Sequence, residues 1–167
     1  TNRTAERYRT MFREFAEEHG CVVLAPLFPA GVADPGDLHG YKRLLHQGIR
    51  YDAVLLDIVE QIGRRYTVAT ERFLLHGFSG GGQFAHRFAY LHPERLAALS
   101  VGAPGRITRI DPDVPWWLGT ADVAERFGRE IDLVTLRTVP VHMLVGDADT
   151  DTWEIAEPGL DAGGDTR

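Results

Sequence analysis

The chain has 167 residues and a mass of 18.6 kDa, which fits one domain, over residues 1–167, with enough chain for a sizeable core. A hydrophobic share of 44% and a charged share of 25% are ordinary for a globular protein, so composition indicates neither a disordered nor a fibrous chain. The net charge of -6 comes from acidic residues spread along the sequence, which speaks against nucleic acid as a partner.

Signals for membrane insertion and for metal binding are missing. No stretch reaches the roughly 18 apolar residues that a membrane span needs, and the start lacks the layout of a signal peptide. We therefore expect a cytoplasmic protein without a membrane span, although Thr1 in place of a methionine leaves open a lost leader. Cys21 is the only cysteine, which excludes an intrachain disulfide and a cysteine-based metal site. The oligomeric state is not predicted.

Helical and strand patterns alternate along the chain. The first helix, over 4–19, carries apolar residues at three- and four-residue spacing and stops at Gly20. The run 21–28 is continuously apolar, as a strand buried on both faces would be. The same patterns predict further helices over 51–65, 84–91 and 121–136, and strands over 72–76, 96–101 and 139–145. This alternation predicts an α/β fold with a mainly parallel sheet.

A glycine-rich turn carries the strongest chemical signal. Gly77-Phe78-Ser79-Gly80-Gly81 matches G-x-S-x-G between a predicted strand and a predicted helix, the context that the motif of a nucleophilic serine requires. We expect that positions 77 and 81 require glycine because strand and helix pass closely there. The turn would lift the Ser79 hydroxyl above the sheet, where the N–H of Gly80 can stabilise an oxyanion.

Two other glycine motifs fit less well. A phosphate-binding P-loop needs Lys and then Ser or Thr, where this chain has Gln83 and Phe84. The dinucleotide fingerprint matches Gly80, Gly82 and Ala85, but the next predicted strand ends at 100–103 without the required acidic residue. We expect neither a nucleotide cofactor nor any other cofactor.

A serine nucleophile needs a base and an orienting carboxylate, in the chain order Ser, acid, His. Three aspartates, Asp147, Asp149 and Asp151, follow the predicted strand 139–145, and we choose Asp149 as the acid. The alternative for the other two is capping of a solvated turn. All seven histidines precede Asp149, so the triad has no histidine at the expected place in this chain.

From about Thr4 to Trp153 the order of elements resembles the α/β-hydrolase fold, a three-layer sandwich. The stretch 77–96 also resembles polyhydroxybutyrate-depolymerase-type esterases and prolyl-oligopeptidase-like enzymes, whose turns carry extra glycines. The resemblance implies strands before the first long helix, a loop there that donates a second oxyanion N–H, and a last strand followed by the catalytic histidine. This sequence contains none of the three. We expect it to be part of a longer polypeptide.

The segment 106–119 is expected to be irregular and carries Trp116 and Trp117. In enzymes of this fold such a segment often caps the acyl pocket, which would make both tryptophans substrate-binding residues. Packing of the loop onto the body is the other interpretation.

These observations predict a serine hydrolase that cleaves small carboxylic esters through an acyl-enzyme on Ser79. Peptide cleavage or acyl transfer would use the same residues. The alternative from another class is a binding module without catalysis on the same scaffold, which the absent histidine favours.

Overall fold

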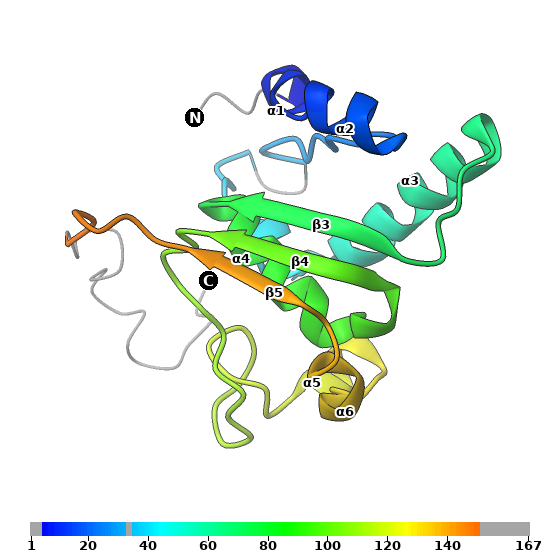
Figure 1. The fold of residues 1–167 in the computed structure, drawn as a ribbon. Coiled ribbons are helices and arrows are strands. Elements are labelled where there is room, and N and C mark those ends of the chain that lie inside the picture. The colour runs from blue at the N-terminus through cyan, green and yellow to red at the C-terminus, as the bar shows by residue number, and fades with distance from the viewer. Residues whose placement is uncertain (1–4, 33–34, 151–167) are drawn as a thin grey trace.

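The computed structural model describes residues 5–32 and 35–150, and its main layer is a three-stranded parallel sheet. The strands β3 (Phe73–Phe78), β4 (Leu96–Gly102) and β5 (Val141–Leu144) stand in the order β3-β4-β5. All three point the same way, so their carboxyl ends meet at one edge of the sheet (Figure 1). The predicted α/β class with a parallel sheet is confirmed.

One face of this sheet is covered by helices and holds the core. Helix α4 (Gly80–Leu91) packs against β3 and β4, behind the sheet in Figure 1. Phe84 and Phe88 of α4 are buried together with Leu55 and Val59 of α3 (Tyr51–Tyr66). Both helices carry apolar residues three or four positions apart, which places those residues on one side. The predictions of α3 and α4 are therefore confirmed.

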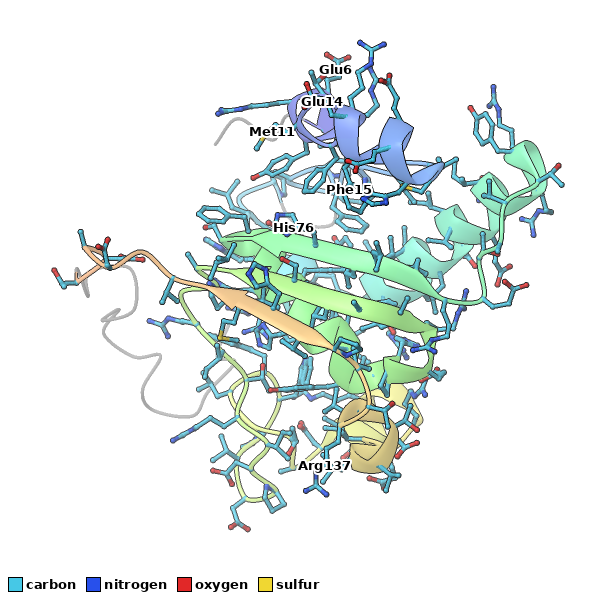
Figure 2. The ribbon with its side chains drawn as sticks, viewed as in Figure 1. Glu6, Met11, Glu14, Phe15, His76 and Arg137 are labelled. Carbon is cyan, nitrogen blue, oxygen red and sulfur yellow. The ribbon has the colours of Figure 1, made fainter. Side chains whose placement is uncertain are left out.

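The other face of the sheet is mostly open. Leu74 and Phe78 on β3 are 60% and 51% exposed. Beyond the edge of the sheet at β3 lie α1 (Ala5–Met11) and α2 (Arg13–His19) (Figure 1), and the centroid of the Phe12 ring between them is 5.2 Å from that of the His76 ring. Figure 2 shows His76 reaching from β3 toward these helices, while Glu6 points away from the sheet. Neither α1 nor α2 contains a buried residue.

The predicted strand over 21–28 is wrong. No strand forms there, Cys21 is exposed, and Val22 and Leu27 are 45% and 55% exposed. An apolar run predicts burial, but a strand also needs a neighbouring strand for its backbone hydrogen bonds. In the described part of the chain β3 is an edge strand, and nothing pairs with it on the side away from β4.

The long helix predicted over 121–136 is also wrong. It is replaced by α5 (Val123–Phe127) and α6 (Leu133–Leu136). Gly128 adopts φ 69°, a left-handed conformation that ends α5. The side chain of Asp132 then accepts hydrogen bonds from the N–H groups of Val134 and Thr135 and starts α6.

The long connection before α3 is more ordered than the sequence suggests. It contains a 3₁₀ turn, η1 (Gly40–Arg43), and a small antiparallel pair, β1 (Leu45–His46) with β2 (Ile49–Arg50). A second 3₁₀ turn, η2 (Pro93–Arg95), joins α4 to β4. The η1 turn packs against α4, which brings it to the carboxyl edge of the sheet.

Candidate active site

Ser79 forms the bend between β3 and α4. Its backbone has φ 52° and ψ -119°, a region that residues with a side chain rarely adopt. The Ser79 N–H donates to the carbonyl of Gly102 at 2.8 Å, and the N–H of Gln83 donates to the Ser79 carbonyl at 3.0 Å. These bonds connect the bend to the end of β4 and to the first turn of α4, so they hold Ser79 in its strained backbone conformation.

The hydroxyl of Ser79 is not used for structure. A serine at the start of a helix usually caps it, but this side chain makes no capping hydrogen bond. Ser79 is exposed and forms no side-chain hydrogen bond with any residue that the structure describes. The next residue, Gly80, begins α4, where the first N–H groups have no partner within the helix. An exposed hydroxyl therefore sits at the positive end of the helix.

The space available for a side chain differs among the glycines around Ser79. A Cβ at position 77 would lie 2.1 Å from the carbonyl oxygen of Gly81, and one at position 82 would lie 2.8 Å from that of Gly102. A Cβ at position 81 would meet no atom within 4 Å. The expectation for Gly77 is confirmed and that for Gly81 is wrong, because the close approach of strand and helix falls at Gly82.

Two side chains from a distant segment lie beside Gly80, and the sequence did not reveal them. A Cβ built on Gly80 would lie 2.5 Å from the hydroxyl oxygen of Tyr41 and 2.7 Å from Cε of Lys42. Both residues belong to η1. A side chain at position 80 would displace the ends of these two side chains, which occupy the space beside it. No local pattern signals this contact, since it joins two distant segments of the chain.

Buried polar contacts hold η1 in this place. Nη1 of Arg87 on α4 donates to the carbonyl of Lys42 at 2.6 Å, and Nε1 of Trp116 donates to the carbonyl of Arg43 at 2.7 Å. Arg87 is 0% exposed, and its Nε donates to Oγ1 of Thr108 at 2.8 Å. The turn is therefore anchored through its backbone to α4 and to the 106–119 segment.

Arg87 is a buried cation without a carboxylate partner among the described residues. Its guanidinium lies 5.0 Å from the centre of the Trp117 ring, and Nη2 has no hydrogen-bond partner. Burial and the charge of Arg43 lower the pKa of Arg87 to about 9, so the side chain is still charged at neutral pH. Hydrogen bonds and the aromatic ring compensate part of the lost hydration.

The segment 106–119 is irregular, as predicted, and both of its tryptophans are buried. Trp116 and Trp117 are 4% and 6% exposed, and the ring of Trp116 packs edge-on against Phe127. These contacts attach the segment to the body of the protein. Substrate binding by the two tryptophans stays a prediction.

The predicted acid lies in the loop after β5. This loop leaves the sheet at the same edge as Ser79, with β4 between the two. Strands are about 4.8 Å apart, so the ends of β3 and β5 are separated by roughly 10 Å. Asp147 and Asp149 are exposed, and the N–H of Asp149 donates to the carbonyl of Gly146 at 3.3 Å. Asp151 lies outside the described residues.

None of the seven histidines forms a hydrogen bond with Ser79. His86 is locked as a neutral ring, since its Nε2 accepts from the N–H of Thr108 and its Nδ1 donates to the carbonyl of Gly82. Burial and the charge of Arg87 lower the pKa of His86 to about 4. His92, at the far end of α4, donates from Nε2 to Asp52 at 2.8 Å and accepts from Arg129 at Nδ1. The ring nitrogens of both histidines are therefore engaged in hydrogen bonds within the fold.

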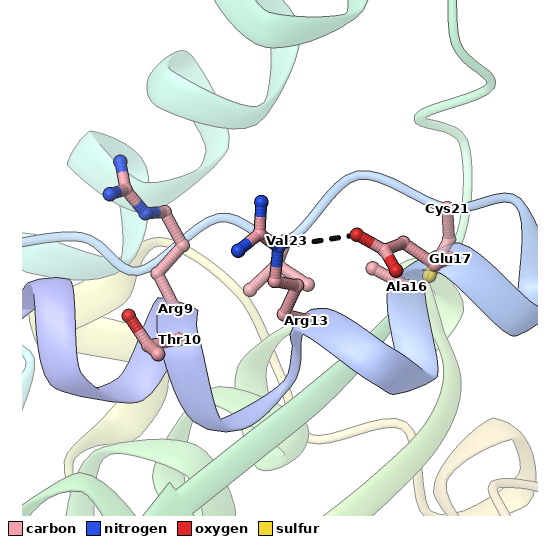
Figure 3. A pocket seen from close by; sticks show the side chains of 7 residues that line it. All are labelled: Arg9, Thr10, Arg13, Ala16, Glu17, Cys21 and Val23. Atoms are coloured by element: carbon pink, nitrogen blue, oxygen red, sulfur yellow. Dashed lines mark hydrogen bonds and ion pairs between the residues drawn. The ribbon is translucent and has the colours of Figure 1, made fainter.

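One further hollow lies in the described part of the chain. A hollow of about 430 Å³ lies between the first two helices and the segment after them (Figure 3). It is lined by Arg9, Thr10, Arg13, Ala16, Glu17, Cys21 and Val23, and an ion pair of Arg13 with Glu17 crosses it. Within residues 5–32 and 35–150, no cluster of three metal-ligating side chains occurs, and no helix is long and apolar enough to cross a bilayer.

Similarity to solved structures identifies the architecture. A poly(aspartic acid) hydrolase from Sphingomonas sp. KT-1 superposes with a TM-score of 0.71 at 24% identity, over 90% of this chain and 59% of its own. A poly(3-hydroxybutyrate) depolymerase from Bordetella parapertussis superposes with a TM-score of 0.72 at 21% identity, over 98% of this chain and 58% of its own. This chain has part of the α/β-hydrolase fold. It spans just under three fifths of each matched structure. No family model and no curated protein matches the sequence.

Proposed function

We propose that this chain carries the nucleophile of a serine hydrolase that cleaves carboxylic esters. The observation that supports the proposal most is the backbone of Ser79, held at φ 52° and ψ -119° between a strand and a helix. A strained bend of this kind is what a nucleophile elbow requires, because it exposes the hydroxyl at the helix N-terminus. The hydroxyl takes no part in capping the helix, so nothing in the fold itself explains why a strained serine stands there.

In the proposed reaction, Oγ of Ser79 attacks the carbonyl carbon while its proton passes to a histidine base. The oxyanion that forms accepts a hydrogen bond from the N–H of Gly80. The alcohol leaves with the proton, and water then hydrolyses the acyl-enzyme. Asp149 orients the histidine, which is not one of the seven in this chain. The reaction requires no metal or organic cofactor.

The names of the two similar structures support acyl chemistry. One is named as a depolymerase of poly(3-hydroxybutyrate), a polyester, and the other as a hydrolase of poly(aspartic acid), a polyamide. Hydrolysis of either linkage proceeds through attack on an acyl carbon. We therefore propose an ester substrate first, and keep peptide cleavage and acyl transfer as activities of the same site.

Labelling of the full-length protein with a fluorophosphonate probe tests the proposal. We expect covalent labelling of the wild type and none of Ser79→Ala. Asp149→Asn should slow labelling strongly, because the base would lose its orientation, while Asp147→Asn should leave it within about threefold of the wild type. Equal labelling of wild type and Ser79→Ala would refute the nucleophile. No labelling of either protein would favour the non-catalytic binding module.

A further inference from the structure

Three arginines surround the ring of Trp117. The guanidinium carbons of Arg87, Arg43 and Arg106 lie 5.0, 5.1 and 5.9 Å from the centre of that ring. They come from α4, η1 and the 106–119 segment, so only the tertiary fold brings them together. We infer that this arginine cluster binds a small free oxyanion of the phosphate or carboxylate class. Arg87 lies eight residues after Ser79, about 12 Å along the helix, so the site is separate from the proposed nucleophile.

The charge of Arg87 is buried and only partly compensated. The side chain is 0% exposed, and although Nε and Nη1 donate to Thr108 and Lys42, Nη2 has no hydrogen-bond partner. Buried N–H donors are rarely left without an acceptor. Burial and the charge of Arg43 lower the pKa of Arg87 to about 9, so the group remains a cation at neutral pH. An anion beside it would supply the negative charge that the described residues do not place there.

Arg43 and Arg106 give an anion access to the cluster. Both are half-buried, so part of each side chain is in contact with solvent, whereas Trp117 is only 6% exposed. The planar fork of N–H donors on a guanidinium matches the oxygens of a carboxylate or a phosphate. An anion held by these two forks would also be attracted by the buried charge of Arg87, because the protein interior screens charges less than water does.

Stacking on Trp117 does not by itself explain three cations in one place. An indole ring has two negative faces and a positive edge, so either two of the arginines share a face or one of them lies at the edge. Both arrangements are unfavourable, since like charges repel one another at this distance. A bound anion turns this repulsion into attraction. It would also join η1, α4 and the 106–119 segment, which the three arginines belong to, and so stabilise the fold.

Calorimetric titration of the full-length protein with inorganic phosphate, at an ionic strength kept constant with sodium chloride, tests the inference. We expect one site with a Kd of about 1 mM or lower, and a Tm raised by about 5–10 °C at a phosphate concentration of about 100 times Kd. Arg43→Gln and Arg106→Gln should each weaken binding about 10- to 100-fold, because each removes charge-assisted hydrogen bonds. Arg109→Gln removes an exposed arginine from the same segment, and this matched control should keep Kd within about twofold.

The inference is wrong if the wild type does not bind phosphate, or if Arg43→Gln and Arg106→Gln bind it as the wild type does. Circular dichroism checks that these variants fold, and one folded variant decides the question. A loss of binding confined to Lys42→Met would place the phosphate beside Gly80, at the start of α4, and would also overturn the inference. Ser79→Ala should bind phosphate like the wild type, so a failure of the proposed function leaves the arginine cluster unaffected.

Discussion

Gly77 and Gly81 flank Ser79 symmetrically in the sequence, yet alanine should have opposite effects at the two positions. A Cβ at position 77 would lie 2.1 Å from the carbonyl oxygen and 2.3 Å from the carbonyl carbon of Gly81, more than 1 Å inside the 3.4 Å at which ordinary contact begins. Both atoms are backbone, so no side-chain rotation relieves the overlap. Either β3 or α4 has to move, which we expect to cost about 3 kcal/mol or more.

At position 81 the added methyl group meets no atom within 4 Å. The residue lies in the first turn of α4, where alanine loses less conformational entropy than glycine on folding. We therefore expect Gly81→Ala to stabilise the protein by about 0.5–1 kcal/mol. The two substitutions add the same methyl group two residues from Ser79, so each is the control for the other.

Thermal melting followed by circular dichroism measures both effects. For a chain of this size, 1 kcal/mol corresponds to a change in Tm of about 2–4 °C. Gly77→Ala should lower Tm by about 6 °C or more, or prevent folding, whereas Gly81→Ala should raise it by about 1–4 °C. The steric reasoning is refuted if Gly77→Ala melts within about 2 °C of the wild type, or if both variants are destabilised alike.

The shifted pKa values of two buried groups make the stability of the fold depend on pH. Burial alone would raise the pKa of Asp52, but hydrogen bonds from Arg50 and His92 outweigh it and hold that pKa well below 3.8. The stabilisation is therefore present above pH 3.8 and lost as the pH falls below it, and Asp52→Asn should flatten acid unfolding followed by circular dichroism. His86 has a pKa of about 4 when folded against an ordinary 6.5, so the folded state resists its protonation. Stability should fall by up to about 3 kcal/mol as the pH drops from 6.5 to 4, and urea midpoints of His86→Gln should lack this slope.

Much of the architecture could be predicted from the sequence because its signals are local. The apolar stripe of α3, the apolar strand β4 and the glycine-flanked serine each show within a window of a few residues. The order in which they occur was enough to predict the parallel sheet and the resemblance to α/β-hydrolases, and the structural comparisons confirm the fold. The roles of Ser79 and Asp149 stay proposals.

Tertiary structure decided what depends on partners far away in the chain. The run 21–28 has the composition of a buried strand, but composition cannot provide a neighbouring strand, so no strand forms. Gly128 divides a helical pattern because its backbone turns left-handed there. The contact of Tyr41 with Gly80 arises only where η1 folds onto α4. A periodic sequence specifies which side of an element is apolar, whereas the residues that meet at a site are set by how the elements pack.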